Sequence, residues 1–168
     1  MKLLLAIAFA GLPPWIHAWP IGPGPQYRPA PAPAAVRAGH PVGSLLCSAY
    51  PVRFAAHIEV FARRRVAIVP PGIGHGPGCT YPVSTNAPTG VVRLTQAVTL
   101  GDVFRVWGQP LASRRLLSFR GTTLVFVDGR KWRGDPRRLW LTRHVQVVLE
   151  IGGYVAPHPT YLFPKGTP

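Results

Sequence analysis

The stretch TLGDVFRVWGQP, residues 99–110, decides the fold class of this chain because it carries the clearest helix signal in the sequence. Thr99 and Asp102 have the spacing of a capping box, in which the hydroxyl and the carboxylate each accept a hydrogen bond from the other residue's backbone amide. Apolar residues then recur at i, i+3, i+4 and i+7, as Leu100, Val103, Phe104 and Trp107. Gly108 and Pro110 end the helix. A short helix with one apolar face needs a sheet to pack against.

The residues before this helix predict strands. Alternating side chains in 57–62 and strand-forming residues in 65–69 flank Arg63-Arg64, which indicates a hairpin. Residues 70–88 are rich in glycine and proline and are expected to form a loop. Residues 90–95 (GVVRLT) predict another strand.

The residues after the helix predict a second hairpin and a last strand. Residues 122–127 and 130–133 flank Asp128-Gly129, which is typical of a type I′ turn. Apolar side chains alternate through 144–151. We therefore expect an α+β fold, a single roll in which one short helix lies across a mixed sheet.

The order of these elements resembles a β-grasp (ubiquitin-like) fold. The run TLGDVFRVWGQPL (99–111) and the run GDPRRLWLTRHVQVVLEIG (134–152) also resemble motifs of a group of small exported bacterial proteins of unknown function. The similarity continues through Asp128-Gly129 and Tyr161-Leu162-Phe163-Pro164, and it covers about 47–164. It implies a β-grasp-like domain, expected over 47–165, and export. It implies no activity.

The first 18 residues have the pattern of a secretory signal. Lys2 precedes the apolar run LLLAIAFAGL (3–12), and Ala18 offers a small residue for cleavage. The apolar run is about half the roughly 20 residues that a membrane span needs. Residues 19–46 are rich in proline and glycine and are expected to form a linker, with a Pro-rich recognition ligand as the alternative. We expect a periplasmic or extracellular protein without a later transmembrane segment.

Export changes the interpretation of the two cysteines. Cys47 and Cys79 would meet an oxidising compartment, where a single disulfide is expected to form. Closing a loop of this size stabilises a fold by on the order of 3–4 kcal/mol. Two free thiols or a two-cysteine metal site are the alternatives.

The five acidic residues leave little material for carboxylate catalysis. Asp102 is expected to cap the helix, Asp128 to form the hairpin turn and Asp135 to form a Gly-Asp-Pro turn. Glu59 and Glu150 are interpreted as solvent-facing strand residues. Ser44 lacks the flanking glycines of a nucleophile elbow. We therefore expect no enzyme.

A metal site would have to draw on four histidines: His57, His75, His144 and His158. His57 and Glu59 are expected on one strand face, but no third ligand has a recognisable spacing, so surface histidines are the preferred interpretation. Some members of the resembled group carry histidines in the disulfide loop, where this chain has Ser84, Asn86 and Arg93. Because those side chains replace imidazole poorly, this member would be a degenerate one, and we expect no cofactor.

The glycine-rich run Gly72–Gly78 has the composition of a phosphate-binding loop. It contains Pro77 and lacks a following helix and a Lys-Ser/Thr ending, so we interpret it as a loop only.

The excess of positive charge is the remaining functional signal. The chain has 19 basic and 5 acidic residues, and residues 114–143 alone hold nine basic and two acidic ones. Such a field attracts nucleic acid, anionic lipid or cell-wall polymers. The candidate contacts are Arg63, Arg64, Arg65, Arg130, Lys131, Arg133, Arg137 and Arg138. Trp132 and Trp140 would add stacking or pack in the core. The alternative is compositional, because 16 arginines and 3 lysines are typical of a GC-rich genome.

Three functions follow from these observations, one of which is the degenerate member of a metal-binding group described above. The first is an exported, non-catalytic binding or structural protein of the bacterial envelope. The alternative is a cationic protein that binds a polyanion such as an anionic envelope polymer or lipid surface.

Overall fold

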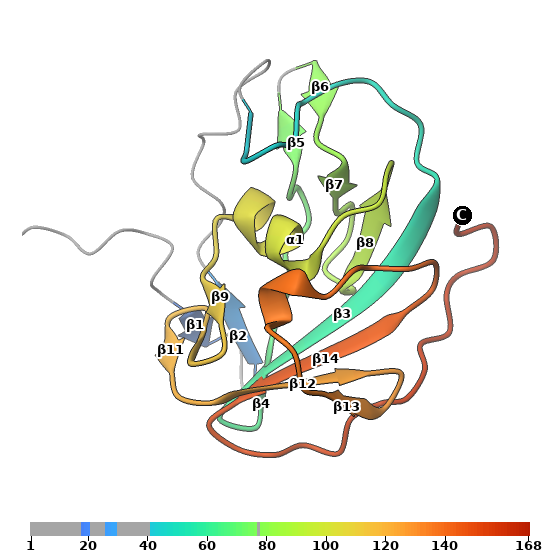
Figure 1. Cartoon of the computed structure of the whole chain (residues 1–168). Helices are drawn as coiled ribbons and strands as arrows, with labels where there is room; N and C mark the ends of the chain where they lie inside the picture. The colour runs from blue at the N-terminus through green and yellow to red at the C-terminus, as the bar shows by residue number, and fades with distance from the viewer. Residues whose placement is uncertain (1–17, 21–25, 30–40, 77) are drawn as a thin grey trace, which may run out of the picture.

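The structure, a computed structural model, describes residues 18–20, 26–29, 41–76 and 78–168. This part of the chain contains a mixed sheet of nine strands, two smaller sheets, one α-helix and one 3-10 helix (Figure 1). The expected α+β class, with a mixed sheet and one short helix, is confirmed. Apart from Ala18, the expected signal segment lies outside the described residues, as does much of the expected linker.

The centre of the sheet joins the two ends of the fold. Strand β3 (Phe54–Ala62) runs parallel to β14 (Gln146–Ile151), and β14 pairs antiparallel with β12 (Thr123–Val127). Strand β13 (Arg130–Trp132) follows β12 and is the last strand of the sheet on that side. Asp128 and Gly129 both have positive φ, 48° and 75°, so the predicted hairpin turn is confirmed.

The other edge of β3 carries two antiparallel partners. Strand β8 (Val91–Leu94) pairs with the first half of β3, and β4 (Arg65–Ala67) pairs with its last residues. Beyond β4 the backbone of β2 (Gln26–Pro29) is parallel to it, and β1 (Ala18–Pro20) pairs with β2. Strand β2 lies within the segment 19–46 that was expected to be a linker, and β1 lies at its start.

The prediction of a loop over 70–88 was wrong in part. The segment contains three strands of two residues each: β5 (His75–Gly76), β6 (Cys79–Thr80) and β7 (Val83–Ser84). Strands β5 and β6 pair with each other, and β7 extends the main sheet beside β8. Two-residue strands have no measurable side-chain alternation, so the sequence pattern does not reveal them.

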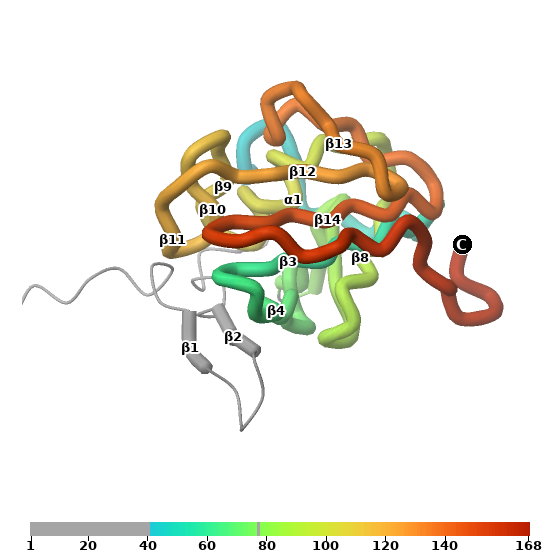
Figure 2. The backbone as a smooth tube through the Cα atoms, turned by 90° about the horizontal axis from the view of Figure 1, so that it is seen from below, coloured from blue at the N-terminus to red at the C-terminus, as the bar shows by residue number. Residues whose placement is uncertain are grey.

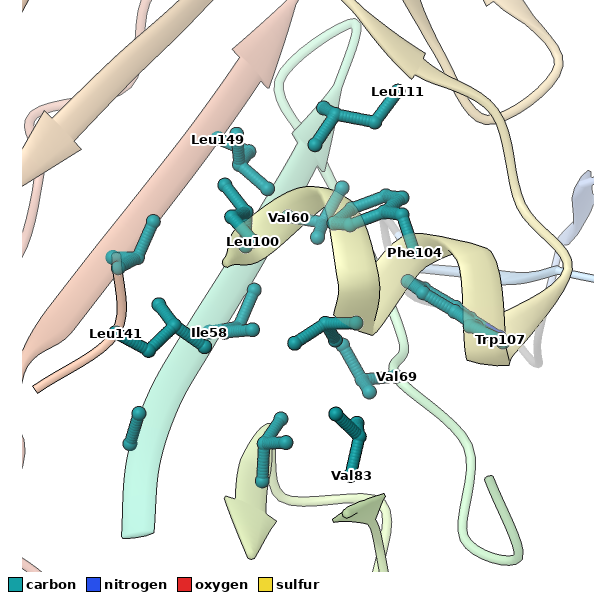
Figure 3. Packing of buried hydrophobic residues seen from close by; sticks show 14 of the residues in the cluster. Ile58, Val60, Val69, Val83, Leu100, Phe104, Trp107, Leu111, Leu141 and Leu149 are labelled. Carbon is teal, nitrogen blue, oxygen red and sulfur yellow. The ribbon is translucent and has the colours of Figure 1, made fainter. Parts of the chain in front are cut away.

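Helix α1 (Leu100–Trp107) covers one face of the sheet. The Thr99 hydroxyl accepts from the Asp102 N–H, the Asp102 carboxylate accepts from the Thr99 N–H, and Gly108 ends the helix with φ 72°. The apolar stripe of α1 packs onto Ile58, Val60 and Leu149 of the central strands (Figure 3). The 3-10 helix η2 (Pro136–Arg138) lies beside α1, where the Leu100 N–H donates to the Leu139 carbonyl.

Residues 111–120, for which the sequence predicts no element, form a small three-stranded sheet. Its strands are β9 (Leu111–Ala112), β10 (Arg115–Leu116) and β11 (Phe119–Arg120). Strand β10 lies in the middle and pairs antiparallel with both neighbours. This small sheet lies next to one end of the main sheet (Figure 1).

The last 17 residues, 152–168, contain no helix or strand and are named the C-terminal strap here. The strap crosses the sheet on the face opposite α1 (Figure 2). Ring contacts attach it to that face, with Tyr161 on His57 and Phe163 on His144. Both faces of the central strands are therefore covered.

No helix among the described residues is long and apolar enough to cross a membrane.

Candidate functional site

The disulfide lies between the segment that leads into β3 and strand β6. The expected bond joins Cys47 to Cys79, with 5.5 Å between their Cα atoms. Ser48 and Thr80, the next residues of the two segments, exchange backbone hydrogen bonds of 3.0 Å. The bond therefore links the 70–88 segment to the start of the folded part of the chain.

Two distant segments with three arginines each meet at one end of the main sheet, where Arg63 and Arg120 line the same hollow, and we name this region the arginine end. Its members are Arg63, Arg64, Arg65, Arg114, Arg115 and Arg120. Arg63 and Arg64 form the turn between β3 and β4, with φ of 51° and 63°, and Arg65 is the first residue of β4. The other three come from the small sheet of β9, β10 and β11. The sequence-predicted contacts include the first three only.

Direct contacts join the two halves of the arginine end. The Arg63 guanidinium carbon lies 5.7 Å from the centre of the Phe119 ring. Arg63, Ser118, Arg120 and Gly152 line a hollow of about 320 Å³ between the two segments. The end of β14 forms the floor of this hollow, because Ile151 lines it as well.

The small sheet places two of these cations opposite each other. Arg115 pairs directly with Arg120 across β10 and β11. Like charges at directly opposed positions of antiparallel strands destabilise the pair. An anion bound between them would relieve that repulsion.

The basic residues of β13 have a different setting. Arg130 and Lys131 of β13, and Arg133 just after it, are exposed at the last strand of the sheet, which β14 and β12 separate from β3. Charged side chains on an edge strand oppose pairing with another chain, which gives these residues a structural role. Of the eight residues predicted as polyanion contacts, Arg63, Arg64 and Arg65 therefore lie on other strands than the basic residues of β13.

The basic residues of η2 are partly neutralised. The Asp135 carboxylate accepts hydrogen bonds from the Arg137 guanidinium at 2.8 and 3.1 Å and from the Arg137 backbone amide at 2.9 Å. These contacts hold the pKa of Asp135 below its usual value and raise the pKa of Arg137. Arg138 is exposed beside this pair.

Both tryptophans near these cations lie at the surface. Trp132 is 39% exposed and Trp140 is 61% exposed, so core packing does not explain either. A Cβ at Gly134 would lie 2.8 Å from the Trp132 indole nitrogen, so this ring is folded back over the chain. Trp140 is the more accessible of the two.

The interpretation of His57 as a surface histidine was wrong, because it is 3% exposed beneath the C-terminal strap. Its Nε2 lies 2.7 Å from the Thr89 carbonyl, to which it donates, and its Nδ1 lies 2.6 Å from the Gln146 side chain. The Tyr161 ring stacks on it at 3.6 Å between centroids and 10° between planes. Gly90 permits the close approach of its segment to β3, since a Cβ there would lie 2.4 Å from the Ile58 carbonyl and 2.9 Å from His57 Nε2.

The interpretation of Glu150 as a solvent-facing residue was also wrong. Its side chain is fully buried on the face beneath the strap, near Phe61 and Leu124 on the neighbouring strands. Neither carboxylate oxygen has a hydrogen-bond partner of good geometry among the described residues. Burial raises the pKa of Glu150, and the nearby Val155 amide opposes that rise without cancelling it. An orphaned carboxylate in this position lowers the stability of the fold at neutral pH.

Glu59 lies on the same face but has a partner. Its carboxylate oxygens accept from His158 Nδ1 of the strap at 2.9 and 3.1 Å. The side chains of Glu59 and His158 are 22% and 64% exposed, so the pair lies at the margin of the strap. This contact is one of those that attach the strap to the sheet.

Among the described residues, no three His, Cys, Asp or Glu side chains come together in a way that could hold a metal ion. His75 pairs with Asn86 at 3.1 Å, and His144 stacks on Phe163. The remaining two histidines make the contacts with Tyr161 and Glu59 that are described above. These four rings each have a local structural partner.

The glycine-rich run leads into a tight structural contact. A Cβ at Gly74 would lie 1.8 Å from the Val83 carbonyl, so only glycine fits there. The Gly74 carbonyl itself accepts from the Tyr81 amide. Gly74 therefore allows close packing within the 70–88 segment.

No protein-family model, curated protein or solved structure matches this chain.

Proposed function

We propose that this chain is a small exported, non-catalytic binding protein of the bacterial envelope, and that it attaches to an anionic polymer through the arginine end. One observation carries the proposal. The segments 60–66 and 111–122 hold six arginines and no acidic residue. They meet at one end of the sheet, where Arg63 and Arg120 line the same hollow and Arg63 lies over the Phe119 ring. A cluster of this kind concentrates positive potential and favours a flexible chain of negative charges.

The non-catalytic part of the proposal is supported by the positions of the acidic residues. Asp102 and Asp135 accept backbone amides at helix starts, and Asp128 accepts from the Gln146 amide. Glu59 accepts a hydrogen bond from His158 of the strap, and Glu150 is fully buried. Each carboxylate therefore has a structural setting.

We further propose that the fold is a β-grasp variant. Its support is the sheet order, in which the first long strand of the fold, β3, and the last, β14, lie parallel at the centre and hairpins extend both sides. The helix follows β8 and precedes β12 in the chain and covers one face. Export is supported by the disulfide.

Retention on immobilised heparin tests the polymer-binding proposal. The wild-type protein should bind at about 50 mM salt, where contacts of the phosphate type are strong, and elute with a steep salt dependence. The variant Arg63→Gln/Arg64→Gln/Arg65→Gln should lower the slope of log affinity against log salt by about 2–3, since each lost contact contributes about 0.9. Circular dichroism and thermal melting establish that the variant is folded.

The matched control removes the same charge from the other basic element. Arg130→Gln/Lys131→Gln/Arg133→Gln on β13 should leave the heparin slope nearly unchanged. Equal losses in the two triple variants would show that net charge alone governs retention and would overturn the assignment to the arginine end. Absence of wild-type retention at about 50 mM salt would overturn polymer binding altogether.

A further inference from the structure

We infer that a second, separate site binds a small organic anion, namely a carboxylate or sulfonate with an apolar body. The site is a hollow of about 320 Å³ between residues 86–93 and the end of the C-terminal strap. It lies on the face of the sheet opposite α1, because Val91 and Arg93 of β8 alternate with the core residues Val92 and Leu94.

The walls of the hollow combine apolar surface with two cations. Ala87, Val91 and Pro164 contribute apolar surface, and Arg93 and Lys165 contribute the charges from opposite sides. Ligand sites in proteins are mostly apolar cavities of roughly 300–1,000 Å³ with a few converging polar groups, so this hollow has the size of a small ligand.

The two cations have no acidic partner among the described residues. The ion pairs there join Arg105 to Asp102, Arg137 to Asp135 and His158 to Glu59. The other two acidic side chains are committed elsewhere, because Asp128 accepts from a backbone amide and Glu150 is buried beneath the strap. Pro168 also lines the hollow, and its main-chain oxygen accepts from the Ala55 amide and lies 3.2 Å from His144 Nε2. Arg93 can therefore offer its planar fork to a ligand carboxylate, with Lys165 as a second charge.

His57 holds both walls in place. Its Nε2 donates to the carbonyl of Thr89, which lines one wall, and its ring stacks on Tyr161 of the strap, three residues before Pro164 on the other wall. The hollow is therefore built by contacts that are present without a ligand, and a preorganised site loses less free energy on binding.

Titration with octanoate, followed by amide chemical shifts of the labelled full chain, tests the site. Saturable shifts should localise to 86–93 and 161–167, and Arg93→Gln/Lys165→Gln should weaken binding by about tenfold or more, the effect expected for charge-assisted contacts. The matched control Arg130→Gln should bind octanoate as the wild type does.

Two further probes complete the design. Octylamine has a similar apolar body and the opposite charge, so it should not bind; equal binding of the amine would overturn the inference. Chemical-shift changes scattered over the surface would also overturn the inference. So would the absence of saturation by about 10 mM octanoate, which corresponds to a binding free energy weaker than about −3 kcal/mol. The triple variant of Arg63–Arg65 should bind octanoate normally, which separates this site from the arginine end.

Discussion

The two faces of the central sheet are covered in different ways. On the α1 face, the residues beneath the helix are apolar, among them Ile58, Val60 and Leu149. The strap face places a buried histidine and a buried carboxylate, His57 and Glu150, beneath a segment without helix or strand. The strap-side apolar cluster is small, since its buried members are Phe61, Phe126 and Val148.

This difference shows that a helix and an irregular segment are held on a sheet by different interactions. A helix buries a continuous apolar stripe and obtains its stability mainly from area removed from water. The strap is attached at separate points: ring stacking on His57 and His144, and a hydrogen bond to Glu59. We therefore expect substitutions on the α1 face to affect stability more than those on the strap face.

The largest effect should come from the α1 face. Phe104→Ala removes a fully buried ring that packs against Trp107 at 5.2 Å, and it should cost about 3–5 kcal/mol of unfolding free energy in a urea titration. Leu162→Ala, at a strap residue that is 92% exposed, is the control and should change stability by less than about 0.5 kcal/mol. A loss below about 1 kcal/mol for Phe104→Ala would contradict the comparison.

A smaller effect should come from the main attachment point of the strap. His57→Ala removes two hydrogen bonds and one stacked pair, which together should cost about 2–3 kcal/mol. A double-mutant cycle with Tyr161→Ala should give a coupling of about 0.5–1.5 kcal/mol. His75→Ala, whose ring contacts the exposed Asn86, is the control. Additive losses would mean that the stacked pair does not attach the strap.

The smallest effect should come from Glu150, and it should be stabilising. Because burial raises its pKa in the folded state above the ordinary value of 4.5, the fold prefers the protonated form. The wild type is therefore relatively most stable below that value and loses stability as pH rises through the raised pKa. Glu150→Gln should gain about 1–2 kcal/mol at pH 7.

The control for this prediction is the paired carboxylate on the same face. Denaturation of Glu150→Gln as a function of pH should show its advantage shrinking toward pH 4. Glu59→Gln, which alters a partly exposed pair, should change stability by about 0.5 kcal/mol or less. A gain for Glu150→Gln that persists at low pH would show that charge burial is not its cause.

The α1 face was largely predictable from the sequence. The capping box at Thr99 and Asp102 and the i, i+3, i+4, i+7 stripe are local signals, as is the Asp128-Gly129 turn. The strap face was not predictable, because a strand whose alternate residues are polar has the same sequence pattern whether solvent or a strap covers those residues. His57 and Glu150 were misplaced for that reason.

The arginine end was predictable only in part. The sequence indicates Arg63, Arg64 and Arg65 as neighbours, but Arg115 and Arg120 join them through a small sheet of two-residue strands. Such strands carry no periodic pattern, and their approach to the β3–β4 turn is a tertiary contact. The hollow beside Arg93 was not predictable either, because it depends on the tertiary contact between residues 86–93 and the C-terminal strap.

The parallel pairing of β3 with β14 has a consequence for the timing of folding. His57 and Gln146, which face each other across these strands, are 89 positions apart in the chain, so the centre of the sheet closes one of the longest loops in the molecule. Contacts of such long range slow folding, because loop entropy is lost before the pairing is gained. A chain synthesised or translocated from its N-terminus therefore has no complete sheet until its last strand is available. Until then β3 presents an unpaired edge, and the molecule is most prone to aggregate in that interval.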